Sequence, residues 1–149
     1  MKYLALITLI LSVSCNCMKN KTSENSLGTN QKYQIIYESA YGGKEEKSYE
    51  VFTSLEDFKS SFESPLLNEE IQKTLSTIDF KTHSLVSLHL GLKNTGGYGI
   101  TVQDVKVNRS QSTVVVKETS PKPGENVTMA LTAPFCIAVI EKNSQVIFE

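Results

Sequence analysis

The stretch Phe135-Cys136-Ile137-Ala138-Val139-Ile140 is apolar at every position. Successive side chains of a strand point to opposite faces of a sheet, so this stretch would bury side chains on both faces. A short continuous apolar run of this kind is typical of a central strand that is covered on both sides. Asn143-Ser144 then supplies a turn, and a last short strand is expected at Gln145–Phe148.

Alternating patterns predict most of the remaining strands. Leu85 to Leu90 alternates, and we expect Ser87 and His89 to lie on its polar, solvated face. Tyr98 to Val107 also alternates, but its apolar parity switches within the run, which predicts a β-bulge near Gln103-Asp104. Further strands are expected at Thr113–Lys117 and Val127–Thr132.

The first part of the chain adds two strands and one or two helices. Tyr33–Glu38 and Tyr49–Phe52 are rich in aromatic and β-branched residues and flank Gly42-Gly43, which predicts a β-hairpin. Thr53 or Ser54 then caps a helix, and Asn68-Glu69-Glu70 opens a second, shorter one. The apolar face of the first helix contains Leu55, Phe58 and Phe62, and Glu56 or Asp57 stands at its capping-box spacing.

These elements predict an α+β fold that is mainly antiparallel β. We expect one sheet-rich domain, a sandwich or a partly open barrel, with one or two short helices after an N-terminal hairpin. Residues 33–149 provide enough chain for a hydrophobic core without disulfides or metal.

The N-terminus has the layout of a leader. Lys2 precedes an apolar run from Leu4 to Leu11, which is too short to span a bilayer, and small residues lead to Cys15. Residues 1–14 are therefore predicted to be a signal peptide, and the segment resembles a bacterial lipoprotein leader, in which the cysteine is lipidated. Ordinary secretion, with Cys15 discarded or left free, is the alternative.

The polar segment that follows predicts a flexible tether, because its composition cannot bury enough apolar surface to fold. Residues 15–32 would thus form a lipid anchor and tether in front of the domain. The expected location is the bacterial cell envelope. No acidic cluster follows Cys15, so we expect the domain to face the periplasm rather than the outer surface.

Composition argues against several classes of function. The formal net charge is −1 and no basic stripe occurs, so nucleic-acid binding is not expected. His83 and His89 lack cysteine or carboxylate neighbours at metal-ligand spacing, and no nucleophile motif is present. We therefore expect no metal, no cofactor and no catalysis. Cys136 is expected to be a buried, reduced thiol in an apolar run.

Two loops stand out between the predicted strands. Asn94–Ile100 holds three glycines in four positions, and glycine either permits a positive φ angle or allows another group to approach closely. It lacks the glycine spacing and the following helix of a phosphate-binding loop. Pro121-Lys122-Pro123-Gly124 is the second unusual loop.

The two loops and their flanking strands together resemble one family. The chain is similar to the PrcB-type protease complex subunits through their C-terminal domain, over roughly Asp79 to Lys142. The resemblance rests on three pieces: Leu85–Gly91 followed by Thr95-Gly96-Gly97-Tyr98, then Pro121–Gly124, and then Ala130–Phe135. Phe135-Cys136 departs from the more usual Pro-Tyr followed by an aliphatic residue.

The resemblance implies a lipoprotein that accompanies or stabilises a secreted or surface protease, or another envelope protein, without catalysis of its own. On that basis a partner would contact the two loops and the Pro-aromatic pair, with Tyr98 as a rigid anchor. The expected partner-binding residues are Thr95, Gly96, Gly97, Tyr98, Pro121, Pro123, Gly124, Pro134 and Phe135.

Three other interpretations stay open at this point. In the first the glycines serve only a tight turn, in the second the Gly-rich loop acts as that of a protease inhibitor, and in the third the protein binds a small ligand. An inhibitor of the known kind would carry a companion Arg-Pro-Trp loop, and this chain has no Trp. Clustering of the loops at one exposed end would favour protein binding.

Overall fold

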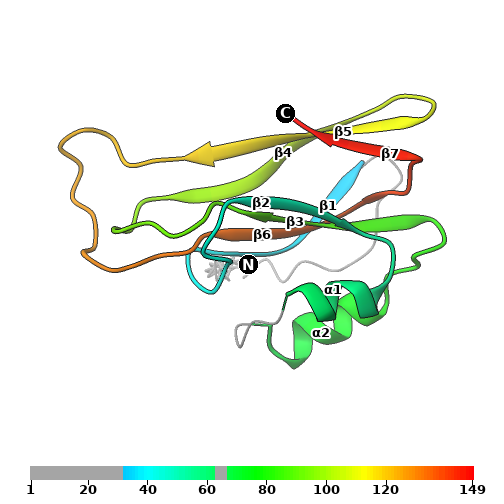
Figure 1. Cartoon of the computed structure of the whole chain (residues 1–149), viewed down its shortest axis with the longest axis horizontal. Coiled ribbons are helices and arrows are strands. Elements are labelled where there is room, and N and C mark those ends of the chain that lie inside the picture. Colours follow the sequence, from blue (N-terminus) through cyan, green and yellow to red (C-terminus); the bar gives the residue numbers. More distant parts are fainter. Residues whose placement is uncertain (1–31, 63–66) are drawn as a thin grey trace, which may run out of the picture.

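The computed structural model describes residues 32–62 and 67–149. This part of the chain contains seven strands and two short helices, whose arrangement is drawn in Figure 1. The strands are β1 (Tyr33–Ser39), β2 (Ser48–Phe52), β3 (His83–His89), β4 (Gly99–Val107), β5 (Gln111–Thr119), β6 (Phe135–Glu141) and β7 (Gln145–Phe148). The helices are α1 (Leu55–Ser61) and α2 (Glu69–Ser76).

The strands form two sheets. The larger sheet has the order β1-β6-β3-β2, and all its neighbours are antiparallel. The predicted central position of β6 is confirmed, since it lies between β1 and β3. The smaller sheet has the order β4-β5-β7, with β4 and β5 antiparallel and β5 and β7 parallel. The register of β4 shifts between Val102 and Asp104, which confirms the predicted bulge.

The molecule has three layers (Figure 1). The small sheet covers one face of the large sheet, and α1 and α2 cover the other. The core between the sheets contains Val86 and Leu88 of β3 with Cys136 and Ala138 of β6. The core under the helices contains the alternate residues of the same strands, together with Phe58 of α1. The expected fold class, sheet-rich α+β in the form of a sandwich, is confirmed.

Local signals placed both helices correctly. The side chain of Ser54 accepts a hydrogen bond from the backbone N–H of Asp57, and Asn68 caps α2 in the same way at Ile71. Phe58 and Phe62 are buried against the large sheet and Leu55 is half-buried, as the apolar face of α1 predicted. No helix in the described part of the chain is long and apolar enough to cross a membrane.

Two expected features of the strands are wrong. β1 and β2 do not form a hairpin, because β1 pairs with β6 and β2 pairs with β3 at opposite edges of the large sheet. Residues 127–132 do not form a strand either. Only Thr132 makes a bridge there, with Lys93, and most of this segment runs as a connection between β5 and β6.

The expectation that Ser87 and His89 lie on a solvated face is also wrong. Both are fully buried, because α1 and the residue after it cover that face of β3. The ring of His89 packs edge-on against Phe62 at 4.7 Å between centroids and stacks with Phe135 at 5.9 Å. The alternating pattern of a strand shows which positions are polar, but it does not show whether a helix covers those positions and buries them.

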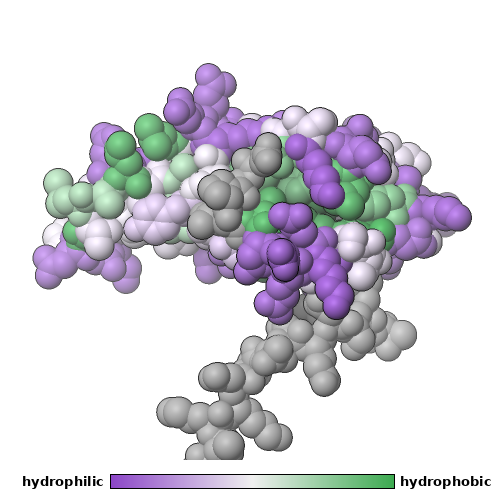
Figure 2. Space-filling model, turned by 90° about the horizontal axis from the view of Figure 1, so that it is seen from below, coloured by the Kyte–Doolittle hydropathy of each residue, from purple (hydrophilic) through white to green (hydrophobic). Residues whose placement is uncertain are grey.

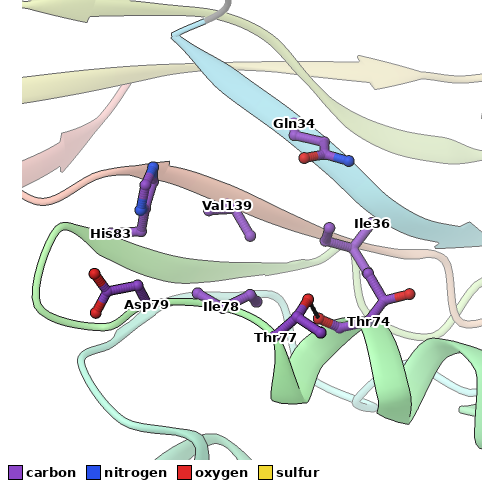
Figure 3. Close-up of a pocket in the computed structure, with 8 residues that line it drawn as sticks. All are labelled: Gln34, Ile36, Thr74, Thr77, Ile78, Asp79, His83 and Val139. Carbon is purple, nitrogen blue, oxygen red and sulfur yellow. Dashed lines mark hydrogen bonds between the residues drawn. The ribbon is translucent and has the colours of Figure 1, made fainter. Parts of the chain in front are cut away.

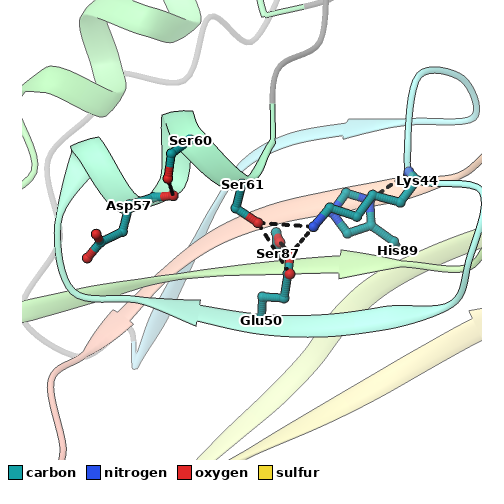
Figure 4. Close-up of polar contacts among 7 residues, drawn as sticks. All are labelled: Lys44, Glu50, Asp57, Ser60, Ser61, Ser87 and His89. Carbon is teal, nitrogen blue, oxygen red and sulfur yellow. Dashed lines mark hydrogen bonds and ion pairs between the residues drawn. The ribbon is translucent and has the colours of Figure 1, made fainter.

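A polar cluster links α1 to this face (Figure 4). The Glu50 carboxylate accepts hydrogen bonds from Lys44 Nζ at 2.6 Å and from Ser61 Oγ at 3.3 Å. His89 Nδ1 accepts a hydrogen bond from the backbone N–H of Lys44 at 3.2 Å. The imidazole proton then belongs on Nε2, which is buried and has no hydrogen-bond partner among the described residues.

The environment of the cluster shifts two pKa values. Burial, assisted by the positive charge of Lys44, lowers the pKa of His89 from 6.5 to about 4, although Glu50 opposes the shift. Partial burial raises the pKa of Glu50, but the hydrogen bond and charge of Lys44 outweigh it, so that the pKa is lowered overall. At neutral pH the cluster is therefore a neutral histidine beside an ion pair.

We predict that acid destabilises the fold through His89. The pKa of His89 is lower in the folded state than in the unfolded state. The free energy of unfolding that is linked to neutral His89 is therefore fully present above pH 6.5 and is lost as the pH drops toward 4. The loss by pH 4 should be roughly 3 kcal/mol. Urea unfolding of the full chain between pH 7 and pH 4 measures it.

His89→Gln keeps a hydrogen-bond acceptor but cannot titrate, so the variant should lack this part of the pH dependence. His83→Gln, at the other end of the same strand, is the matched control and should retain it. If His89→Gln and the wild type lost the same stability over this pH range, the buried neutral histidine would be contradicted.

Candidate functional site

Three connections meet at one end of the sandwich, which we call the loop end. It comprises residues 40–47 between β1 and β2, residues 90–98 between β3 and β4, and residues 120–134 between β5 and β6 (Figure 1). Hydrogen bonds join the connections to one another. The predicted loops thus lie together at one end of the molecule, the arrangement that favours a protein-binding surface over isolated turns.

The Gly-rich loop is fastened to the long connection before β6. Lys93 and Thr132 exchange two backbone hydrogen bonds of 2.8 and 2.9 Å, and the backbone N–H of Gly96 donates to the Thr128 carbonyl at 2.9 Å. The Thr132 hydroxyl donates to the Thr95 carbonyl at 2.9 Å. These bonds hold the two segments side by side without regular secondary structure.

Packing within the chain explains two of the glycines. Gly96 is buried, and a Cβ atom there would collide with the side-chain hydroxyl of Thr128. Gly97 has a φ angle of +85°, and its Cβ would lie 3.1 Å from both Pro121 and Val127. The chain's own loops therefore require glycine at both positions. The interpretation that these glycines serve the turn is favoured over close approach by a partner.

The other predicted site residues differ in exposure. Tyr98 is half-buried against the core between the sheets, and Lys93 Nζ lies 5.7 Å from the centre of its ring. Pro121 is half-buried against Gly97, whereas Pro123 and Gly124 are exposed. Tyr98 is thus packed against the rest of the domain and does not project freely, as the tip of an inhibitor loop would.

Pro134 and Phe135 do not belong to an exposed surface. Both are buried, and the Pro134 carbonyl accepts a hydrogen bond from the backbone N–H of Leu90 at 3.0 Å. The ring of Phe135 packs in the core under the helices. They anchor the long connection to β3, and neither side chain is exposed on the surface of the loop end.

Sequence reasoning missed an apolar patch at the loop end. It consists of exposed Met129 (88% of its surface), Leu131 (62%), Tyr41 (49%) and Leu92 (48%). Figure 2 shows hydrophobic side chains gathered at that end of the face seen from the helix side. Met129 and Leu131 stand two positions apart, a spacing that favours a strand and so gave no sign of an exposed patch.

A cavity of about 300 Å³ opens beside the patch, between the end of β1 and the start of β4. Its walls combine hydroxyl and carboxylate groups with aromatic and aliphatic surface. The lining residues are Glu38, Ser39, Ala40, Tyr98, Gly99, Ile100, Thr101, Thr119 and Phe135.

A second cavity, of about 240 Å³, lies at the opposite end of the large sheet, between β1 and the end of α2 (Figure 3). Ile36, Ile78 and Val139 supply its apolar wall, and Asp79 and His83 lie at its rim. The Asp79 carboxylate already accepts hydrogen bonds from the Lys81 backbone and the Thr82 hydroxyl, and the latter also contacts His83. These polar groups mainly fix the turn before β3.

The described residues contain no group of three or more His, Cys, Asp or Glu side chains that could hold a metal ion. Cys136 is a free, buried thiol, as expected, and burial next to the Glu38 carboxylate raises its pKa to about 12. Such a thiol stays protonated and is a poor nucleophile. In the cluster of Figure 4, the Ser61 and Ser87 hydroxyls point to Glu50 and not to His89.

Comparison of the sequence with known proteins finds a similar family, in the part of the chain that contains the central strands and the loop end. Residues 85–141 match the family model described as PrcB C-terminal. The match runs from β3 to the end of β6 and so includes the central strand pair, the Gly-rich loop and the long connection. No curated protein and no solved structure matches the chain. Residues 85–141 thus match the PrcB-type family that the sequence motifs resemble.

Proposed function

We propose that this protein is a non-catalytic accessory subunit that binds and stabilises a protease of the cell envelope. The family suggests a subunit associated with a protease complex. The observation that carries the proposal is the loop end, where three connections are held together and present a patch of large apolar side chains. Exposed apolar patches of this kind are a common mark of protein-binding surfaces.

The apolar patch suits a partner energetically. Burial of a large apolar side chain contributes about 1.5–3 kcal/mol, and Met129 and Leu131 are the most exposed members of the patch. Internal hydrogen bonds on both sides, at Thr128 and Thr132, already order the segment that carries them. A partner would therefore lose less free energy to ordering of the loop on binding.

A role without catalysis fits the state of the reactive groups. His89 is enclosed between aromatic rings, and its Nδ1 already accepts a backbone hydrogen bond. A general base must reach the proton that it removes, and these contacts leave no access for a substrate. The cluster instead ties α1 to the large sheet and supports the geometry of the neighbouring residues 40–47.

Anchoring to a membrane through Cys15 is a second part of the proposal. The leader-like residues 1–14 and the polar residues 15–32 lie outside the described part of the chain, apart from Lys32, and rest on the sequence alone. A lipid on Cys15 would hold the domain in the bacterial cell envelope, facing the periplasm. Confinement to a membrane surface would raise the local concentration of the subunit near an envelope protease.

Loss of the apolar patch should abolish capture of the protease. We predict that the double variant Met129→Ser/Leu131→Ser, in an affinity pull-down of the tagged full chain from detergent-solubilised membranes, recovers less than about a tenth of the protease recovered by the wild type, since the two side chains supply several kcal/mol. Mass spectrometry identifies and quantifies the protease.

Val107→Ser is the control, because Val107 is also an exposed apolar residue (41%) but ends β4 at the other end of the small sheet. This control should capture as much protease as the wild type. Recovery of no protease by the wild type would contradict the function, and undiminished capture by the double variant would contradict the surface.

Lipidation gives a separate prediction. Cys15→Ser should move the protein from the membrane fraction to the soluble fraction and remove the mass of the lipid from the mature chain. Cys17→Ser, two residues further along, is the control and should stay in the membrane fraction. A Cys15→Ser protein that remained membrane-bound would show that another feature holds it there.

A further inference from the structure

We propose that the cavity between β1 and β4 binds an extended segment of the partner protein that places a lysine or arginine side chain beside Glu38. This inference rests on the proposed function and names the part of the partner that the loop end would recognise. It is carried by the two strand edges that border the cavity, by Gly99 and by the unpaired charge of Glu38.

The cavity lies where two sheet edges face each other. β1 is the terminal strand of the large sheet and pairs only with β6, and β4 is the terminal strand of the small sheet and pairs only with β5, within residues 32–62 and 67–149. Further along, the two strands touch, since the Tyr33 hydroxyl donates to the Gln103 carbonyl at 2.9 Å. At Ser39–Ala40 and Gly99–Thr101 they separate and leave the cavity. Terminal strands with free edges are the elements to which extended peptides add.

Gly99 keeps this edge open. Unlike Gly97, it has no positive φ angle, and unlike at Gly96, an added Cβ would meet nothing closer than the Thr119 Cβ at 3.9 Å. Neither the backbone nor packing in the chain therefore requires glycine at this position. Glycine inside a strand often marks the close approach of another backbone, and Gly99 lines the cavity at the start of the free edge of β4.

Glu38 gives the cavity its charge. Its carboxylate accepts a hydrogen bond from the Thr101 hydroxyl across the gap between the strands, which fixes it at the cavity wall. In the described part of the chain, the ion pairs are Lys44–Glu50, Lys47–Glu118 and Lys106–Glu149, so Glu38 is without a cationic partner there. A cationic side chain at this point would form a charge-assisted hydrogen bond with the carboxylate.

The remaining walls suit a segment with alternating side chains. Ser39 and Thr119 offer hydroxyl groups, while Tyr98 and Ile100 offer apolar surface. Tyr41 of the apolar patch directly follows Ala40, which lines the cavity. One partner could therefore cover the patch with its surface and insert an extended segment into the cavity.

Two labelled peptides test the charge and the edge together. The probes are a fluorescein-labelled, capped Thr-Val-Lys-Val-Thr peptide and its twin with glutamate in place of the lysine, titrated with the full chain in detergent and followed by fluorescence anisotropy. The wild type should bind the lysine peptide at least about tenfold more tightly than the glutamate peptide. Glu38→Lys should reverse this preference.

Gly99→Val should abolish binding of both peptides, since its side chain would fill the cavity while valine suits a strand. Glu141→Lys is the matched control for Glu38→Lys. Glu141 is an exposed glutamate at the end of β6, whereas the cavity lies at the start of that strand, so this variant should leave the preference unchanged. Circular dichroism establishes that each variant is folded.

Equal binding of the two peptides by the wild type, an unchanged preference in Glu38→Lys, or no binding of either peptide would overturn the inference. The pull-down separates this failure from failure of the proposed function. If the wild type captures a protease and folded Glu38→Lys and Gly99→Val capture it equally well, the cavity is not the contact but the accessory role stands.

Discussion

Pairing of β3 with β6 places two strands at the centre of the large sheet whose side chains are buried on both faces. Apolar surface on both faces must be removed from water, so the strand pair needs a layer on each side. The small sheet supplies one layer and α1 and α2 supply the other. The three-layer arrangement follows from this requirement, and residues 85–141, which match the family, contain both strands of the pair.

The same pair positions the loop end. Leu90 follows β3 directly and bonds to Pro134, which immediately precedes β6, so the two connections start and end at one place. From there the bonds at Lys93 and Gly96 fasten the Gly-rich loop to the long connection. The apolar patch and the cavity beside it are therefore built on the most buried part of the fold. A surface supported in this way can remain ordered without a partner.

Sequence patterns were sufficient where one segment decides its own structure. The apolar run of β6, the parity switch before Asp104 and the cap at Ser54 each predicted the observed element. They failed where a distant segment decides. Nothing local states that β1 joins β6 rather than β2, or that α1 covers His89. For the candidate site, the sequence singled out the loops, but neither their clustering nor the burial of individual loop residues was predictable, because both depend on which loops pack together.

Hydrogen–deuterium exchange of the full chain, resolved to single amides, tests most directly whether the loop end is a preformed surface tied to the central strands. We expect slow exchange for β3 and β6 and, close to them, marked protection of the amides of Lys93, Gly96 and Thr132, whose hydrogen bonds join the two loops. Exchange of these three amides at the rate of an unstructured peptide, with β3 and β6 still protected, would contradict this expectation.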